Sequence, residues 1–386
     1  MDQKISVLMN IIKGEVCASP VDMAAFLALG EEEQEALIQI ARKHSVLQLV
    51  GDALGKDPAT KNLPLTQSLL LETFQSLQRT EKIEAERRAI CRVLEEAEIP
   101  YIQLKGSRLR PLYPEPWMRS SGDIDILVQE DQAERAAQLL MQQRGYKRGK
   151  VEYHDIHLYA KTGVLLELHF HIKEDTQPMD SVLERVWSYS RPAEEGRSEY
   201  LQSNEYFLFH LIAHMAYHFI SGGCGIRTFV DLLVLRDRFA WDDDAVRRLC
   251  RQAGVDHFYQ NVQALVGVWF DGRPHTAVTR RMEEYVLSGG TFGNHTNHVA
   301  AEKGQSGGKL AYIGRRLWRP TDKLCHRYPS LEKHLWLMPA YQVRRWLDVF
   351  LHGDTRRITK EMEIVQTMDA SASSEIEQML RENGLL

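Results

Sequence analysis

The chain has 386 residues, of which 44% are hydrophobic and 26% are charged. It is too long for one small domain and too apolar for a disordered chain, so two or three packed domains are expected. The 48 Lys and Arg residues against 53 Asp and Glu residues give a net charge of −5, which excludes an overall attraction to nucleic acid or to an anionic membrane. Five scattered cysteines without a Cys-x-x-Cys pair argue against a disulfide framework and a structural zinc site, and favour a cytoplasmic location.

Two segments bear on targeting. Residues 1–16 mix charged residues with a short apolar run and lack the apolar centre of a secretory signal. Residues 206–226 contain no Asp, Glu, Lys or Arg, but they carry three histidines and end in glycines. This pattern predicts a buried or interfacial helix, and no membrane span is expected.

Residues 1–95 are predicted to form a helical N-terminal region. Apolar residues recur at helical spacing around positions 7–12, 23–27 and 37–41. Residues 66–97 contain no Gly or Pro and are apolar on one side and charged on the other, which is typical of a long surface helix. Pro100 then ends the helical pattern.

Residues 96–190 are predicted to form the α+β core. Two strands are expected, over residues 101–104 and 123–128. The second of them alternates carboxylate and apolar side chains, as a half-buried strand does. A helix is expected over residues 131–143, followed by strands over 153–160 and 164–172.

Residues 191–386 are predicted to form a helical C-terminal domain, since helical periodicity returns from about residue 179. The clearest helices are expected over 204–220, 227–238, 241–253 and 258–270. Residues 309–346 are basic and contain interspersed aromatic side chains. This region either binds a polyanion such as tRNA or forms a solvated helical surface with buried tryptophans.

Two carboxylates, Asp123 and Asp125, occupy alternate positions of the strand predicted over 123–128. Alternate side chains of a strand share a face and lie about 6.6 Å apart along the backbone. Like charges this close repel unless cations lie between them. Two divalent ions about 3.5–4 Å apart polarise the attacking and leaving oxygens in phosphoryl and nucleotidyl transfer. The spacing therefore predicts a metal site.

Five nearby residues extend this constellation. Gly106 and Ser107 follow a strand and open a predicted helix, which offers N–H groups and a hydroxyl to a phosphate, and Lys105 adds a positive charge. Glu167 lies among leucines, where a carboxylate is costly unless it faces a site. Arg119 either neutralises phosphate charge or pairs with a carboxylate to anchor its loop.

The amino-acid sequences of these segments resemble those of a known family. The run LKGSRLRPLYPEPWMRSSGDIDILV, followed by LLELHFHI and HLIAHMAYHFISGGCGIRTFVDLLVL, is similar to the uncharacterised bacterial nucleotidyltransferase-like family of the DNA polymerase β-like nucleotidyltransferase superfamily. The resemblance covers roughly residues 80–350. It implies an α+β fold in which a mixed sheet is flanked by helical N-terminal and C-terminal regions.

The resemblance also implies an activity, the transfer of a nucleoside monophosphate from an NTP to an acceptor hydroxyl with Mg2+ or Mn2+. Gly106 and Ser107, aided by Lys105 and Arg119, would hold the NTP. Asp123 and Asp125 would bind both metal ions, and Glu167 would complete the ion nearer the acceptor. The acceptor, whether protein, RNA or small molecule, is left open. The loop to Asp123 is longer than in minimal members, and Phe170 stands where Trp is commoner.

Other side chains suggest competing interpretations. His210, His214 and His218 share one face of the helix predicted over 204–220, and two histidines at this spacing can bind one metal ion or line a cleft. Arg227 and Asp231 are expected to form an ion pair within one helix.

Two further classes of protein stay open. His154 and Asp155, with His157, resemble the His-Asp doublet of metal-dependent phosphohydrolases, although that fold is all helical and this segment is predicted to be β. A catalytically inactive nucleotide-binding or antitoxin-like module is the other alternative. Three clustered acids argue against it, because such a module has no physical need for them.

Overall fold

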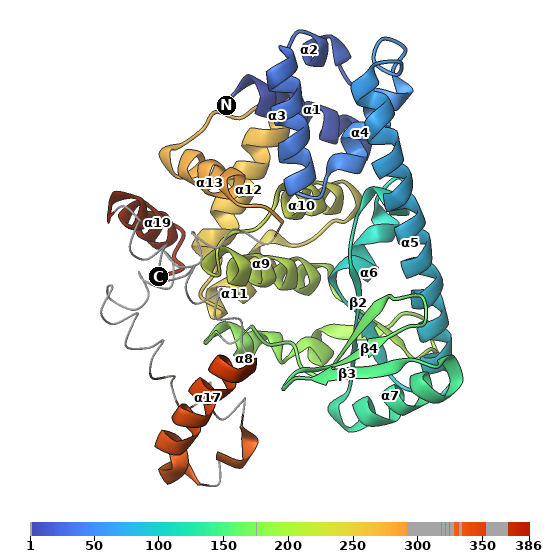
Figure 1. Cartoon of the computed structure of the whole chain (residues 1–386), viewed down its shortest axis with the longest axis vertical. Helices are drawn as coiled ribbons and strands as arrows, with labels where there is room; N and C mark the ends of the chain where they lie inside the picture. The colour runs from blue at the N-terminus through green and yellow to red at the C-terminus, as the bar shows by residue number, and fades with distance from the viewer. Residues whose placement is uncertain are drawn as a thin grey trace.

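The computed structural model describes residues 2–174, 176–291, 318, 321, 324, 328–331, 334–352 and 370–386. One seven-stranded mixed sheet lies beside a large assembly of helices (Figure 1). This arrangement confirms the expected α+β fold, in which helical segments precede and follow a mixed sheet.

The strands of the sheet follow the order β3-β4-β5-β2-β1-β7-β6. Their bounds are β1 Tyr101–Gln103, β2 Asp123–Val128, β3 Lys147–Val151, β4 Asp155–Tyr159, β5 Leu165–His169, β6 Ser190–Pro192 and β7 Glu199–Gln202. The central strand β2 pairs antiparallel with β1 and parallel with β5, and β4 continues the sheet antiparallel to β5. Strands β2, β5 and β4 are therefore direct neighbours.

The sheet has one apolar and one polar face. Ile124 and Ile126 of β2 pack with Leu166 and Leu168 of β5 in a core that includes residues of α5 (Pro64–Glu96) and α7 (Glu130–Arg144), and all four are fully buried. Figure 1 shows α5 running along the side of the sheet and α7 beneath it. Because side chains alternate along a strand, the acidic residues of β2 lie on the opposite face.

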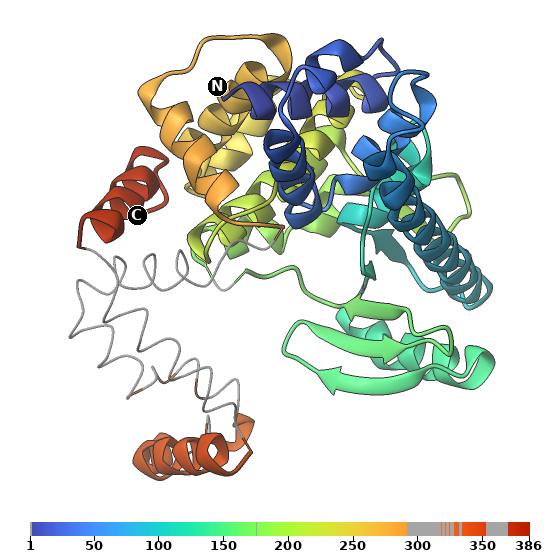
Figure 2. The same cartoon turned by 45° about the horizontal axis from the view of Figure 1, so that its top comes forward.

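The remaining helices form one assembly around a second core. Before the sheet they are α1 Gln3–Val16, α2 Met23–Leu27, α3 Glu31–Lys43 and α4 Leu47–Lys56, and within and after it α6 Lys105–Leu109, α8 Met179–Leu183, α9 Asn204–Ile220, α10 Ile226–Arg238, α11 Asp243–Gln252, α12 Asp256–Asp271 and α13 Ala277–Ser288. Helix α1 packs against both α10 and α12. Helices that precede the sheet and helices that follow it therefore share one hydrophobic core, and they lie side by side in Figure 2.

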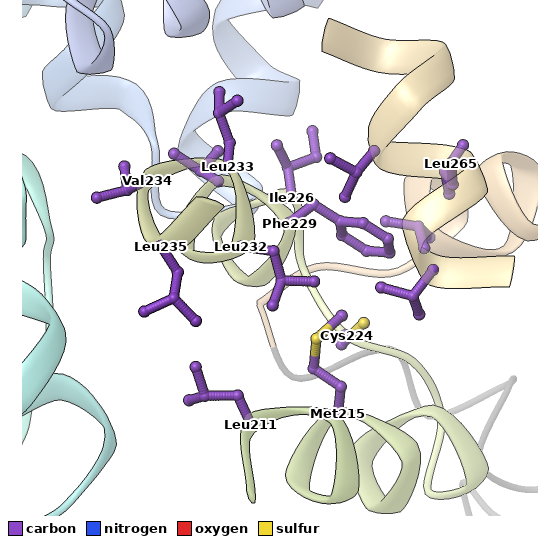
Figure 3. Packing of buried hydrophobic residues seen from close by; sticks show 14 of the residues in the cluster. Leu211, Met215, Cys224, Ile226, Phe229, Leu232, Leu233, Val234, Leu235 and Leu265 are labelled. Carbon is purple, nitrogen blue, oxygen red and sulfur yellow. The ribbon is translucent and has the colours of Figure 1, made fainter. Parts of the chain in front are cut away.

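Helices α9 and α10 form the part of this core that borders the polar face of the sheet. Figure 3 shows Leu211 and Met215 of α9 pointing toward Leu232 of α10, with Cys224 of the intervening turn beside them. These side chains are at most 7% exposed, so the two helices are held in a fixed relation by close packing.

The helices predicted over 204–220, 227–238, 241–253 and 258–270 agree with α9 to α12 within two residues at each end. The return of helical periodicity from about residue 179 gave no sign of β6 and β7, because strands of three and four residues are too short to show a period of two. Strand β7 pairs in parallel with β1 and so extends the sheet. The division into 1–95, 96–190 and 191–386 stays a prediction.

The chain ends in two further helices, α17 (Met338–His352) and α19 (Ala370–Glu382), of which α19 packs against α13. Much of the basic region predicted over 309–346, including residues 309–317, lies outside the described residues. Trp318 and Trp336 are 52% and 77% exposed, so the expectation of buried tryptophans is wrong for both. Among the helices of the described residues, including α9, none has the length and apolar content needed to cross a membrane.

Candidate active site

Three acidic side chains gather on the polar face of the sheet. Asp125 of β2 lies directly opposite Glu167 of β5 in the parallel register, and Asp123 precedes Asp125 by two residues on the same face. All three line a cavity of about 650 Å³ between the sheet, α5 and the helices α9 and α10. The structure therefore brings together the three acids predicted from the sequence.

The acids repel one another, and their ionisation reflects it. Burial, together with the charges of Asp125 and Glu167, raises the pKa of Asp123 to about 6. Burial acts in the same direction on Asp125, but Lys105 and a hydrogen bond with His169 outweigh it and hold the pKa of Asp125 below its ordinary value. Asp123 is thus the acid of this group whose charge is least compensated, and a bound cation would favour its ionised form.

Lys105 supplies a positive charge to this group from the start of α6. Its φ of +36° lies in the left-handed region, an unfavourable conformation for a non-glycine residue, and such strain recurs at functional sites. Among the described residues Lys105 makes no ion pair within 4.0 Å. Burial opposes its charge, but Asp125, Glu174 and the other site acids raise its pKa. Lys105 therefore stays protonated beside the carboxylates and is available to a ligand.

Gly106 and Ser107 follow Lys105, but only Gly106 lines the cavity. A Cβ on Gly106 would lie 2.6 Å from Nη1 of Arg119, so only glycine lets this arginine approach the backbone of α6. Ser107 is buried, its N–H donates to the carbonyl of Leu104 at 3.0 Å, and its Oγ has no partner among the described residues. A contact between Ser107 and a phosphate stays a prediction.

Arg119 lies in the loop before β2 and reaches the same wall of the cavity. Its Nε and Nη2 donate to the two carboxylate oxygens of Asp231 at 2.7 and 2.9 Å, and Tyr113 donates to Asp231 at 2.7 Å. The carboxylate-pairing interpretation of Arg119 is thus correct, and Nη1 still faces Gly106. The expected pair of Arg227 with Asp231 is wrong, because Arg119 occupies that carboxylate and Arg227 donates instead to the carbonyl of Ser120.

This geometry agrees with a comparison of the sequence with family models. Residues 30–271 match the model of a family described as uncharacterised nucleotidyltransferases. The chain belongs to this family. No curated protein and no solved structure matches the chain.

Membership in the nucleotidyltransferase family confirms the resemblance seen in the sequence and supports a general role in nucleotidyl transfer with a nucleotide substrate. The matched residues begin earlier and end earlier than the 80–350 expected. The match includes every acid described above, together with Lys105 and Arg119.

One residue that sequence reasoning did not assign, His169, belongs to the same site. Its Nε2 lies 3.1 Å from Oδ1 of Asp125 and 3.6 Å from Glu167. Burial opposes its charge, but the hydrogen bond with Asp125 and the nearby carboxylate of Glu167 raise its pKa to about 9. The sequence feature that could have identified His169 is its position two residues after Glu167, because residues at this spacing share one face of a strand.

The histidines of α9 divide into two groups. His214 and His218 line the cavity, whereas His210 is buried and its Nδ1 meets Gln202 at 3.3 Å. His214 contacts the buried carboxylate of Glu174 through Nδ1 at 2.7 Å and Nε2 of His218 through its own Nε2 at 3.0 Å. Burial lowers the pKa of His214, and it lowers that of His218 to about 3. Both imidazoles are therefore neutral at pH 7.

Two arginines from outside the predicted core also line the cavity, Arg79 of α5 and Arg227 of α10. Sequence reasoning missed Arg79, because nothing in its own segment distinguishes it from the other charges of a long helix. Tertiary structure brings Arg79 to the site, because α5 passes the loop that precedes β2. A Cβ on Gly122 of that loop would lie 3.2 Å from Nη2 of Arg79.

Proposed function

We propose that this member of the nucleotidyltransferase family transfers a nucleoside monophosphate from an NTP to an acceptor hydroxyl, with Mg2+ or Mn2+ as cofactor. The observation that carries the proposal is the placement of Asp123, Asp125 and Glu167 on two neighbouring strands that face one cavity. Family membership supports the same reaction class.

The donor set fits Mg2+ or Mn2+. Both ions prefer oxygen ligands, and three carboxylates on one face supply them. Burial and the neighbouring acids raise the pKa of Asp123, so a bound cation would favour the ionised form of this ligand. Asp123, Asp125 and Glu167 would hold the metal. When bound, such ions polarise the attacking and leaving oxygens of the transfer.

The positive side chains on the cavity wall suit a triphosphate. Lys105, Arg119, Arg79 and Arg227 all line it, although the overall charge of the chain is negative. Arg119 is held by Asp231 through two of its nitrogens, which leaves Nη1 in a fixed orientation. Fixed cations lose little entropy on binding a phosphate, so these residues would orient the NTP.

The neutral histidines of α9 suit the acceptor. His214 is oriented by Glu174, and one imidazole nitrogen of a neutral histidine is a proton acceptor. The hydroxyl proton of the acceptor would pass to the pair formed by His214 and His218. In-line attack on the α-phosphorus then requires the acceptor oxygen and the pyrophosphate on opposite sides of that phosphorus.

The test is incubation of purified protein with each α-labelled NTP and Mg2+, alone and with cell extract, followed by separation of protein, RNA and small molecules. Label that enters one fraction and is lost in Asp125→Asn would establish the reaction and the class of acceptor. Asp237→Asn is a matched control, because Asp237 is exposed and lies on the far part of α10. Metal-dependent NTP binding without transfer would favour the inactive module.

The phosphohydrolase alternative has less support. Asp155 begins β4 of a mixed sheet, whereas the doublet of those enzymes lies on a helix of an all-helical fold. Cytoplasmic location and contact of residues 309–346 with nucleic acid stay predictions.

A further inference from the structure

The polar face of the sheet continues past the three acids onto β4. His157 lies opposite Glu167 in the antiparallel register of β4 and β5, and Asp155 lies opposite His169. Ligand atoms of Asp155, His157 and Glu167 all lie within 4.8 Å of one another. The mechanism proposed above uses neither Asp155 nor His157.

Asp155 is the unusual member of this group, because it is a buried carboxylate without a strong cationic partner. It is 2% exposed, and among the described residues no Lys or Arg lies within 4.0 Å of it. Its Oδ1 is buried and has no hydrogen-bond partner there. A buried carboxylate left in this state is costly, so the arrangement indicates that a cation completes it.

The approach of the histidines agrees with this interpretation. Nε2 of His157 and Nε2 of His154 each lie 3.5 Å from Oδ2 of Asp155, which is longer than the usual 2.7–3.2 Å of an N–H···O hydrogen bond. Two ligands of one tetrahedral zinc ion at bond lengths of 2.0–2.1 Å are roughly 3.3 Å apart. The spacing of Asp155 and His157 is close to that value.

We propose that Asp155 and His157 bind a transition-metal ion of the Zn2+ class, with Glu167 as the third ligand. An imidazole ligand favours Zn2+ over Mg2+, which prefers oxygen, so this site differs in kind from the one formed by Asp123 and Asp125. The ion neutralises Asp155 and fixes the orientation of Glu167. Only the effect of the ion on Glu167 as an active-site residue rests on the proposed function. The zinc site itself is inferred from the geometry of its ligands and does not depend on that function.

A second group of the same kind, formed by His154, Asp155 and His169, is less suitable. Nε2 of His169 is already hydrogen-bonded to Asp125 at 3.1 Å. The structure therefore favours the group that contains His157, and His154 becomes a matched control. It has the same chemistry and the same distance to Asp155, but it lies outside the proposed ligand set.

The experiment is calorimetric titration of the full chain with Zn2+ in a buffer that contains excess Mg2+, with Co2+ absorption spectra as a second readout. We expect one Zn2+ per chain and the intense visible bands of tetrahedral Co2+. His157→Gln should weaken Zn2+ binding by more than the roughly 10–100-fold loss that follows removal of an outer partner of a metal ligand. His154→Gln removes only a neighbour of Asp155, so its loss of affinity should stay within that outer-partner range.

Asp155→Asn should also lose Zn2+ binding. If Asp155→Asn does not fold, because Asp155 is buried, the result for His157→Gln decides the test. Asp123→Asn should keep Zn2+ while it loses Mg2+-dependent NTP binding, so failure of the two proposals can be told apart. Full Zn2+ binding by His157→Gln would overturn the proposal. Loss of Zn2+ binding in His154→Gln would overturn this ligand set. Loss of Zn2+ binding in His218→Gln alone would place the ion at α9 and would overturn the proposal as well.

Discussion

Asp231 of α10 accepts hydrogen bonds from Nε and Nη2 of Arg119 at 2.7 and 2.9 Å and so ties the loop before β2 to the helical assembly. Both side chains are buried, and Tyr113 adds a third hydrogen bond to the same carboxylate. The position of Asp123, four residues after Arg119, therefore depends on a helix more than 100 residues later in the sequence.

Asp231→Asn should destabilise the protein strongly. The substitution leaves Arg119 buried without its counter-ion, and breaking a buried pair in this way costs about 3–5 kcal/mol of unfolding free energy. Urea denaturation of the two proteins measures the difference. Asp237→Asn, in the exposed part of the same helix, should change the unfolding free energy by at most about 0.5 kcal/mol. Equal stability of the Asp231 and Asp237 variants would show that the pair does not hold the loop.

Asp123→Asn should leave the melting temperature unchanged or raise it at pH 7.5. The folded carboxyl has a pKa of about 6, above the unfolded value of about 3.9, so the folded state favours its neutral form. The associated stability is complete below about pH 4 and is lost as pH rises through 6, and Asn retains it because it is always neutral. Calorimetric scans between pH 5 and pH 8 check this. A lower melting temperature at pH 7.5 would contradict the assigned repulsion.

Mg2+ should bind more weakly in acid than at neutral pH. The metal requires ionised carboxylates, and Asp123 protonates as pH falls through about 6. At pH 5 about one tenth of this group is ionised, so the apparent affinity should fall roughly tenfold between pH 7.5 and pH 5. Titration calorimetry at the two values measures the change. A constant affinity would show that Asp123 is not a ligand.

Lys105→Met should weaken NTP binding while Lys61→Met, in an exposed loop, should not. Lys105 lines the cavity and makes no ion pair among the described residues. A hydrogen bond to a charged group contributes about 1.5–3 kcal/mol, which corresponds to roughly 10–150-fold in Kd. The measurement is calorimetry with a non-hydrolysable NTP. Unchanged affinity in Lys105→Met would place the triphosphate elsewhere in the cavity.

The local sequence pattern was sufficient to predict the core of the fold and the three acids of the site. The alternation of β2 placed Asp123 and Asp125 on one face, and the apolar neighbours of Glu167 marked it as a site residue. Neither signal depends on a partner elsewhere in the chain, because a strand's two faces follow from its own sequence.

The rest of the site could not be read in this way, because it depends on contacts between distant segments. The partner of Arg119 is 112 residues away, so the sequence offered Arg227 as a closer candidate for Asp231. Arg79 resembles the other charges of α5 until the loop before β2 is placed beside it. Strands β6 and β7 were missed for a related reason, since their stability comes from pairing with β1 and with each other.

His214→Gln should lower kcat of label transfer by about 100-fold or more, with little change in the KM for NTP, because the substitution breaks the His214–His218 pair proposed to take up the acceptor proton. Glu174→Gln should cause a smaller loss and change the pH profile, since Glu174 orients His214 through a 2.7 Å contact. The exposed His257→Gln is the control. These rates are measured in the extract-supplemented assay with α-labelled NTP. Full activity of His214→Gln would assign proton transfer to another group, and Glu167 would then be the remaining base beside the acceptor.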